Sequence, residues 1–169
     1  MYKKIAIQQM KETFKDAEFG IIHTLNVLEN AERISKSENL VNDAFKVVVL
    51  SAIYHDIGAL EAEKKHGNMM GKYQEIEGPP IARNYMTLTD LDRSIVDRVC
   101  YIVGNHHTQE AIDGVDFRII WEADLLENMR GLVLTQDDKQ LIDFIDKSFI
   151  LDESKKIAFE KYLANKYDR

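Results

Sequence analysis

The sequence contains few residues that break helices, since only 2 of its 169 residues are proline and 8 are glycine. So few breakers argue against a β-sandwich of short strands and many turns, and they favour long helices. Hydrophobic residues make up 45% and charged residues 30% of the chain, which is typical of a globular protein. We therefore predict an all-α protein of about seven to eight helices, folded as a single domain over residues 1–169.

Cysteine is scarcer still, because Cys100 is the only one. A single thiol cannot form an intramolecular disulfide, which agrees with a reducing compartment. Cys100 lies in the apolar stretch 95–103, so we interpret it as a buried structural thiol rather than a nucleophile. The chain also lacks an apolar run near the ~20 residues of a membrane span, and its N-terminus turns polar too early for a signal peptide. We expect a soluble, cytoplasmic protein with no membrane contact.

Positive charge is in deficit, with 22 lysines and arginines against 29 aspartates and glutamates and a net charge of −7. This balance argues against general nucleic-acid binding, although a local basic pocket remains compatible with it.

The spacing of apolar residues predicts where the helices lie. The expected helices cover about residues 1–18, 21–37, 45–57, 74–87, 89–103, 116–131, 141–150 and 152–167. Gly58 is interpreted as a left-handed cap after the third helix, and the charged stretch 59–73 as the longest loop. The core of the domain then spans about residues 20–130, with C-terminal helices at 136–167 packing on it.

The most unusual stretch is an apolar run, Val47 to Tyr54, that leads directly into His55 and Asp56. Its length favours a buried helix over a buried strand. Taken alone, the His-Asp pair is compatible with a core helix whose two polar residues form local hydrogen bonds. A second interpretation is that the helix holds two metal-capable side chains rigidly at its end.

The other histidines favour the second interpretation. Most of the five lie at or next to the ends of expected helices, where sites are commonly built. The five are His23, His55, His66, His106 and His107. Asp124 adds an aspartate on the core face of the helix expected at 116–131. Burying an ionised aspartate is unfavourable unless it meets a cation or hydrogen-bond donors, so Asp124 is either a hydrogen-bonded core residue or a ligand.

Together, these residues resemble the H…HD…D pattern of the HD superfamily of metal-dependent phosphohydrolases. The flanking sequences, Ala52–Gly58 and Glu122–Glu127, look like the family's central and closing acidic motifs. The resemblance covers about residues 23–128 and implies an all-α fold and hydrolysis of a phosphate ester. It implies a small phosphorylated substrate, with nucleotides as the leading class. The metal ligands that it implies are His23, His55, Asp56 and Asp124.

The residue types suit this chemistry independently of the resemblance. Two imidazoles and two carboxylates, without a thiolate, form a mixed shell for a divalent Mn, Fe, Co, Ni or Mg ion. Water on such an ion ionises near neutral pH, and a phosphoryl oxygen can occupy another coordination position.

Further residues are candidates for catalysis, or for orienting water and the ligand histidines. His106 and His107 match a histidine pair that some members use for a second ion, whereas Gln74 stands where those members carry another histidine. An amide is a poor ligand for a transition metal, so this departure favours one ion over two. Glu77 and Glu127 are either orienting carboxylates or surface residues. His66 is a weaker candidate ligand, and otherwise a solvated loop residue.

Three cations lie near this region, namely Arg83, Lys72 and Lys65. Each is a candidate for phosphate binding or a plain surface charge. Two other interpretations of the whole chain remain open: a non-catalytic HD-type module that binds a metal or nucleotide for regulation, and a helical interaction domain with structural histidines. The amphipathic terminal helices either cover the core or form a homodimer interface.

Overall fold

The computed structural model describes residues 1–133 and 137–164, and every regular element in these ranges is a helix. The all-α prediction is confirmed, and the expected count of seven to eight helices is slightly too low. The elements are α1 (Tyr2–Phe14), α2 (Glu18–Ser37), α3 (Asn42–Tyr54), α4 (Ala59–His66), α5 (Gly71–Thr87), α6 (Arg93–Val103), the 3₁₀ turn η1 (Gln109–Ala111), α7 (Val115–Asn128), α8 (Arg130–Val133), α9 (Asp138–Ser148) and α10 (Asp152–Tyr162).

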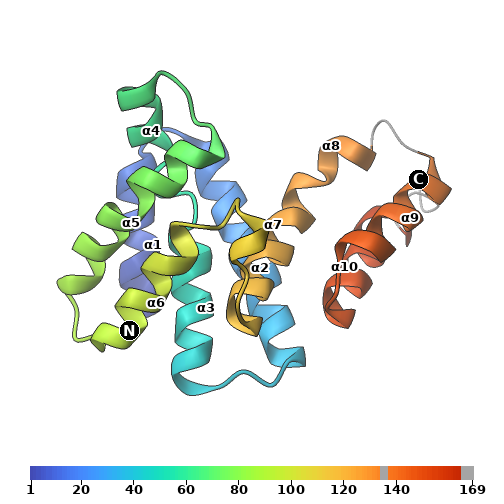
Figure 1. Ribbon diagram of the computed structural model, residues 1–169, viewed down its shortest axis with the longest axis horizontal. Helices are drawn as coiled ribbons and strands as arrows, with labels where there is room; N and C mark the ends of the chain where they lie inside the picture. Colours follow the sequence, from blue (N-terminus) through green and yellow to red (C-terminus); the bar gives the residue numbers. More distant parts are fainter. Residues whose placement is uncertain (134–136, 165–169) are drawn as a thin grey trace.

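Helix α3 lies at the centre and packs against α1, α2, α6 and α7. Helices α4, α5 and α6 lie to one side of it, and α9 and α10 lie at the other end of the molecule (Figure 1). Every residue of α3 from Val47 to Tyr54 is buried, so this helix is apolar all round, as expected for one surrounded by others. The predicted buried helix is therefore present, and it ends at Tyr54, just before the His-Asp pair.

Residues 59–66, which were expected to belong to a loop, form helix α4. The loop prediction for these residues is wrong because Ala59–Lys65 consists of strong helix formers, despite its charge. Glu61 and Lys65 also form an ion pair one turn apart, at 3.3 Å. The helix ends at Gly67, whose φ of 74° gives the left-handed cap.

Gly58 is not a left-handed cap, since its φ is −81° and it precedes α4. A glycine is needed there for a different reason, which is the close approach of α5. A Cβ on Gly58 would lie 2.5 Å from the backbone nitrogen of Gly78 and 2.7 Å from the carbonyl oxygen of Gln74. Gly78 in turn packs against Val103 of α6, whose Cγ1 a Cβ would meet at 2.8 Å. This glycine contact holds the His-Asp turn against α5.

The first two helices also differ from the prediction at their boundary. Helix α1 ends at Phe14, and Gly20, which was expected to break the chain, lies inside α2. The ring of Phe14 lies against Gly20, where a Cβ would meet it at 2.7 Å. Gly20 therefore serves close packing rather than a helix end.

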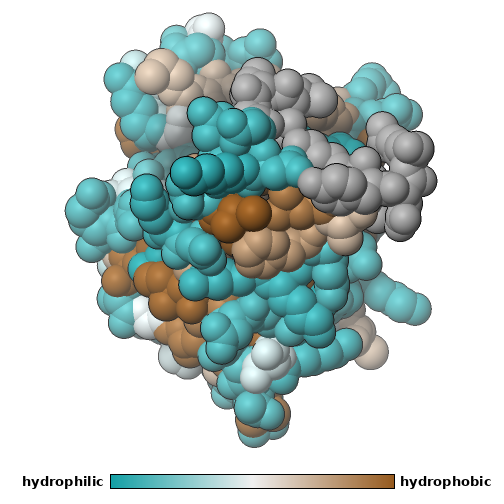
Figure 2. Space-filling view, turned by 90° about the vertical axis from the view of Figure 1, so that its right-hand side faces the viewer, coloured by the Kyte–Doolittle hydropathy of each residue, from teal (hydrophilic) through white to brown (hydrophobic). Residues whose placement is uncertain are grey.

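The C-terminal helices pack against the rest through α10, which contacts α2 and α7. Helix α9 begins with a capping box in which Asp137 and Gln140 exchange side-chain hydrogen bonds with backbone N–H groups. Figure 2 views the molecule from the end at which Figure 1 places α9 and α10. The surface seen there is mostly hydrophilic, with a hydrophobic patch near its middle. Residues 136 and 165–167, the expected ends of the C-terminal segment, lie outside the described residues. Within residues 1–133 and 137–164, no helix combines the length and the apolar character needed to cross a bilayer.

Candidate metal centre

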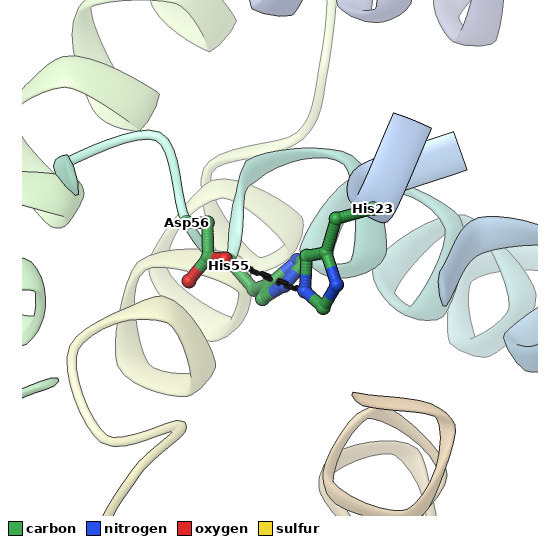
Figure 3. Close-up of side chains that lie close together, drawn as sticks. All are labelled: His23, His55 and Asp56. Carbon is green, nitrogen blue, oxygen red and sulfur yellow. Dashed lines mark hydrogen bonds and ion pairs between the residues drawn. The ribbon is translucent and has the colours of Figure 1, made fainter. Parts of the chain in front are cut away.

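Three helices bring the four expected ligands to one place. His23 lies on α2, His55 and Asp56 follow the end of α3, and Asp124 lies on α7. These three helices pack against one another in every pairing, which is why residues up to 101 positions apart in the chain can meet. Figure 3 shows the side chain of His23 reaching from α2 towards His55 and Asp56.

The side-chain donor atoms converge closely. The Nε2 atoms of His23 and His55 are 3.2 Å apart, and Asp56 Oδ2 lies 3.4 Å from each of them. Asp124 Oδ1 lies 3.0 Å from His23 Nε2 and 3.7 Å from His55 Nε2. His23, His55 and Asp56 offer ligand atoms that all lie within 4.8 Å of one another, as a metal site requires. The donor atoms of these three residues thus face a common point, and Asp124 Oδ1 lies beside it, next to both histidine nitrogens but outside the group that meets the 4.8 Å criterion.

A backbone hydrogen bond determines which nitrogen of His55 faces this point. His55 Nδ1 lies 2.8 Å from the carbonyl oxygen of Ala52, which can only accept, so Nδ1 carries a proton. In the neutral ring, Nε2 then has an unprotonated lone pair directed at His23 and the carboxylates. This lone pair and the carboxylate oxygens repel one another unless His23 donates from its Nε2, His55 becomes protonated, or a metal ion lies among them. Backbone orientation of a histidine in this way is usual at metal sites.

Asp124 supplies a second indication that the site suits a cation. Its Oδ2 accepts a hydrogen bond from Asn128, at 2.9 Å, one turn further along α7. Its Oδ1 is buried, and the nitrogen nearest to it, His23 Nε2 at 3.0 Å, can donate to it only when that nitrogen carries a proton. With an unprotonated His23 Nε2 this carboxylate oxygen would lack a donor, which is unfavourable, and a coordinated cation would satisfy it. The residues present therefore fit a divalent ion.

Without an ion, the carboxylates favour protonation of His55. Burial alone would lower the pKa of His55, but Asp56 and Asp124 outweigh burial and raise this pKa to about 9. Burial opposes the charge of both aspartates, and the neighbouring histidines nevertheless hold their pKa values below the usual range. The site is thus built for two negative charges balanced by positive charge.

A second group of possible ligands adjoins the first through Asp56, whose Oδ1 lies 3.3 Å from His106 Nε2. Asp56, His106 and His107 also have ligand atoms within 4.8 Å of one another. The Nδ1 atom of His106 lies 2.8 Å from the carbonyl oxygen of Val103, so its Nε2 is directed inward as in His55. Burial and the adjacent His106 lower the pKa of His107, which is therefore neutral at pH 7.

Glu75, which is not among the residues expected from the sequence, holds this histidine pair in place. Its Oε1 accepts hydrogen bonds from the backbone N–H of His107 and from the hydroxyl of Thr108, each at 2.9 Å. No periodicity in the sequence distinguishes this glutamate from other helical carboxylates. Only the packing of α5 on α6 brings it to the turn after α6.

The expected candidates on α4 and α5 gather in a separate polar cluster. Glu77 accepts hydrogen bonds from Lys65, at 2.6 Å, and pairs with His66 Nε2, at 2.9 Å. The ring of His66 stacks on that of Tyr73, with centroids 4.2 Å apart. Lys72 Nζ also lies over the Tyr73 ring, 4.6 Å from its centroid. His66 therefore belongs to neither group of possible metal ligands among the described residues.

The remaining candidates make other contacts. Gln74 Nε2 donates to the carbonyl oxygen of Met69, at 2.8 Å, and its Oε1 is buried without a partner in the described ranges. Arg83 pairs with Asp97 of α6 at 2.7 Å and is exposed. The structure therefore does not bring Arg83 to the four central residues.

Glu127 lies one turn after Asp124 but is directed at other helices. Its carboxylate accepts hydrogen bonds from Asn26 and Asn30 of α2, at 2.9 and 3.2 Å, and from Lys161 of α10. Burial opposes its charge, and these donors nevertheless lower its pKa. Glu127 thus ties α7 to α2 and α10 next to the centre.

Known proteins resemble this chain in sequence and in fold. The family model of the HD domain matches residues 20–147. The structure is similar to the crystal structure, at 1.45 Å resolution, of a predicted HD superfamily hydrolase from an uncultured Thermotogales bacterium. The TM-score is 0.70 and the identity 21%, and the match covers 93% of this chain and 83% of that chain. At this identity the likeness shows the fold. A comparison with curated proteins found no match.

Proposed function

The chain belongs to the HD-domain family, and on this basis we propose that it is a metal-dependent phosphohydrolase. Its proposed substrate is a small molecule that carries a phosphate ester, with nucleotides as the leading class. The observation that carries this proposal is that His23 Nε2 and His55 Nε2 lie 3.0–3.7 Å from each other, from Asp56 Oδ2 and from Asp124 Oδ1.

These four atoms are the proposed ligands of one divalent ion. When bound, such an ion supplies a water of lowered pKa and polarises a phosphoryl oxygen, which is the chemistry of phosphate-ester hydrolysis. The two carboxylates balance the two charges of the ion, and the backbone carbonyl of Ala52 keeps His55 in the tautomer that can coordinate. Side-chain exposures of 11% for His23 and 20% for Asp56, against 0% for His55, favour access of substrate from the side of His23 and Asp56.

His106 and His107 are the proposed groups that handle protons. His106 Nδ1 donates to the carbonyl of Val103, so the Nε2 of this ring is the atom that faces Asp56 and can exchange a proton there. His107 is neutral at pH 7, so it is able to accept a proton or to donate a hydrogen bond to the leaving oxygen. Glu75 holds the backbone at His107 and thereby positions both rings.

Among the three expected phosphate-binding cations, Lys72 is the one that we favour. Lys65 is engaged by Glu61 and Glu77, and Arg83 by Asp97, so their charges are already balanced. Lys72 lies over the Tyr73 ring and has no carboxylate partner in the described ranges. It directly follows Gly71, whose Cα packs against the ring of His107.

We propose one ion for each chain rather than two. The group formed by Asp56, His106 and His107 offers three possible ligand atoms, but Gln74 stands where the family resemblance leads to a fourth, a histidine. A neutral amide is a weak ligand for a transition metal, and Gln74 uses its amide nitrogen to bind Met69.

The experiment that tests the function combines metal analysis with a substrate screen. Protein purified without chelator is analysed for Mn, Fe, Co, Ni and Mg, and is then assayed with nucleotides, sugar phosphates and a generic phosphate ester. We expect about one ion per chain and metal-dependent release of phosphate from at least one substrate.

The matched controls are His55→Ala and Asp56→Ala, which remove two proposed ligands, and Arg83→Ala, which removes an exposed residue away from them. The first two variants should lose both the ion and the activity, whereas Arg83→Ala should retain them. Phosphatase activity that persists in His55→Ala and Asp56→Ala, with contaminants excluded, would refute the assignment. A metal-loaded protein that hydrolyses nothing in the screen would favour a non-catalytic HD-type binding module.

A further inference from the structure

Phe19 is the most exposed phenylalanine of the chain, with 85% of its surface accessible. The other six phenylalanines are buried or packed against the core: Phe14, Phe45, Phe117, Phe144, Phe149 and Phe159. Exposing a large aromatic ring to water is unfavourable, so such a ring next to a site is a candidate for ligand contact.

The position of Phe19 relative to the centre is well defined. It lies one turn before His23 on α2, and the two rings are nearly parallel, with centroids 6.4 Å apart and 15° between their planes. His23 directs its Nε2 at the proposed metal ligands, so the ring of Phe19 flanks the side on which the centre is exposed.

The backbone that carries Phe19, the first turn of α2, is held in place by packing. The ring of Phe14 packs against Gly20, the residue next to Phe19. Packing of α2 against both α3 and α7 orients the rest of the helix.

Exposed apolar side chains also lie on the other side of Asp56. Its Oδ2 faces His23, and its Oδ1 faces His106, which is followed by His107. Gly71 lies against His107, and the residues before it, Met69 and Met70, are 42% and 58% exposed. The polar centre is thus bordered by the exposed ring of Phe19 at one edge and by exposed methionines, whose side chains are adaptable, at the other.

From this arrangement we infer that Phe19 is a specificity-determining residue that stacks on a flat aromatic ring in the leaving group of the substrate. The inference rests on the proposed hydrolysis of a phosphate ester and narrows its substrate class to esters that carry an aromatic ring close to the phosphate. The metal-binding and proton-handling residues provide the chemistry, and Phe19 provides the selection.

The test compares two ligands that differ in the flatness of one ring. Metal-loaded protein is titrated with benzylphosphonate and with cyclohexylmethylphosphonate, which cannot be hydrolysed, and the ratio of their dissociation constants is measured by calorimetry. Phe19→Leu keeps an apolar side chain without the ring, and Phe19→Tyr keeps the ring. Leu88→Ala is the matched control, because Leu88 is 76% exposed but follows the far end of α5.

We expect the wild type to prefer the benzyl compound, and Phe19→Leu to reduce this preference by about fivefold, the size of a typical aromatic pair. Phe19→Tyr and Leu88→Ala should retain the preference. An unchanged ratio in Phe19→Leu, or an equal loss in Leu88→Ala, would overturn the inference.

Hydrolysis of benzyl phosphate, measured on the same preparations, separates this inference from the proposed function. If the wild type hydrolyses benzyl phosphate but Phe19→Leu leaves the ratio of dissociation constants unchanged, the proposed function stands and the inference about Phe19 is wrong. If the ratio of dissociation constants depends on Phe19 but benzyl phosphate is not hydrolysed, the aromatic contact stands and the proposed hydrolysis is wrong.

Discussion

His23 and His55 place their Nε2 atoms 3.2 Å apart, although they belong to different helices and are 32 residues apart in the chain. Because His55 Nδ1 is bound to the carbonyl of Ala52, the His55 nitrogen at this contact carries a proton only when the whole ring is charged. When both rings are neutral, His23 therefore has to be the donor at this contact. The carboxylates of Asp56 and Asp124 beside the pair favour a cation between α2 and α3, either the proton of a charged His55 or a metal ion.

A divalent metal should stabilise the folded protein. Ligand that binds only the folded state at a concentration of 100 times its dissociation constant adds about 2.7 kcal/mol to the free energy of unfolding. We expect added Mn²⁺ to raise the Tm of chelator-treated wild type, as measured by differential scanning fluorimetry. His55→Ala should show no such rise, and an equal rise in that variant would place the ion elsewhere.

The metal-free protein should lose stability as the pH rises from about 6.5 towards 9. Burial opposes the charge of His55, but Asp56 and Asp124 raise its pKa to about 9, above the ordinary value of 6.5. A raised pKa contributes stability that is complete below the unfolded-state value and is lost as the pH passes the folded-state value. Urea unfolding of chelator-treated protein across this range measures the slope. His55→Gln should flatten it, and an unaltered slope in this variant would assign the effect to another group.

Substitution of two acidic residues of α7 should have different effects, one on the stability of the fold and the other on metal binding. Glu122 is fully buried and accepts hydrogen bonds from the backbone N–H groups of Ile150 and Leu151, at 2.8 and 3.2 Å. Glu122→Ala should lower the free energy of unfolding by about 1–3 kcal/mol, because buried donors lose their acceptor. It should retain the metal, as measured by elemental analysis. Asp124→Asn should instead lose the metal, and the opposite pattern would exchange the roles of the two residues.

The contact between α5 and the His-Asp turn should tolerate no side chain at Gly58. A Cβ there would lie 2.5 Å from a backbone nitrogen of α5, which cannot move aside as a flexible side chain would. Gly58→Ala should destabilise the fold by about 1–3 kcal/mol in urea unfolding. Gly131→Ala, where a Cβ would meet no atom of the described residues within 4 Å, is the control and should stay within about 1 kcal/mol of wild type. Equal effects in both variants would contradict the close contact.

Lys72 should matter for substrate binding and Arg83 should not. Loss of a hydrogen bond to a charged group corresponds to about a tenfold change in affinity, so Lys72→Met should raise KM for a phosphate ester about tenfold. Arg83→Met removes a cation that already pairs with Asp97 and should leave KM close to wild type. Steady-state kinetics on the substrate found in the screen measures both, and a larger effect in Arg83→Met would reverse the assignment.

Much of the fold could be predicted from the sequence, because burial leaves a local pattern. The apolar run that ends at Tyr54 is readable as a buried helix, and the scarcity of proline and glycine favours an all-α chain. Local patterns failed where a residue serves distant packing. Gly20 and Gly58 look like helix ends in the sequence, but they accommodate Phe14 and the backbone of α5.

For the site, the candidate ligands could be named from the sequence, because His23, His55, Asp56 and Asp124 match the H…HD…D pattern of the family that the chain resembles. Which other groups lie near them follows only from the packing of the helices. This packing paired Arg83 with Asp97, directed Glu127 to α2 and α10, and placed Phe19 beside His23. The reason is physical: helical periodicity specifies the face on which a residue lies, whereas its neighbours depend on how helices far apart in the chain pack against that face.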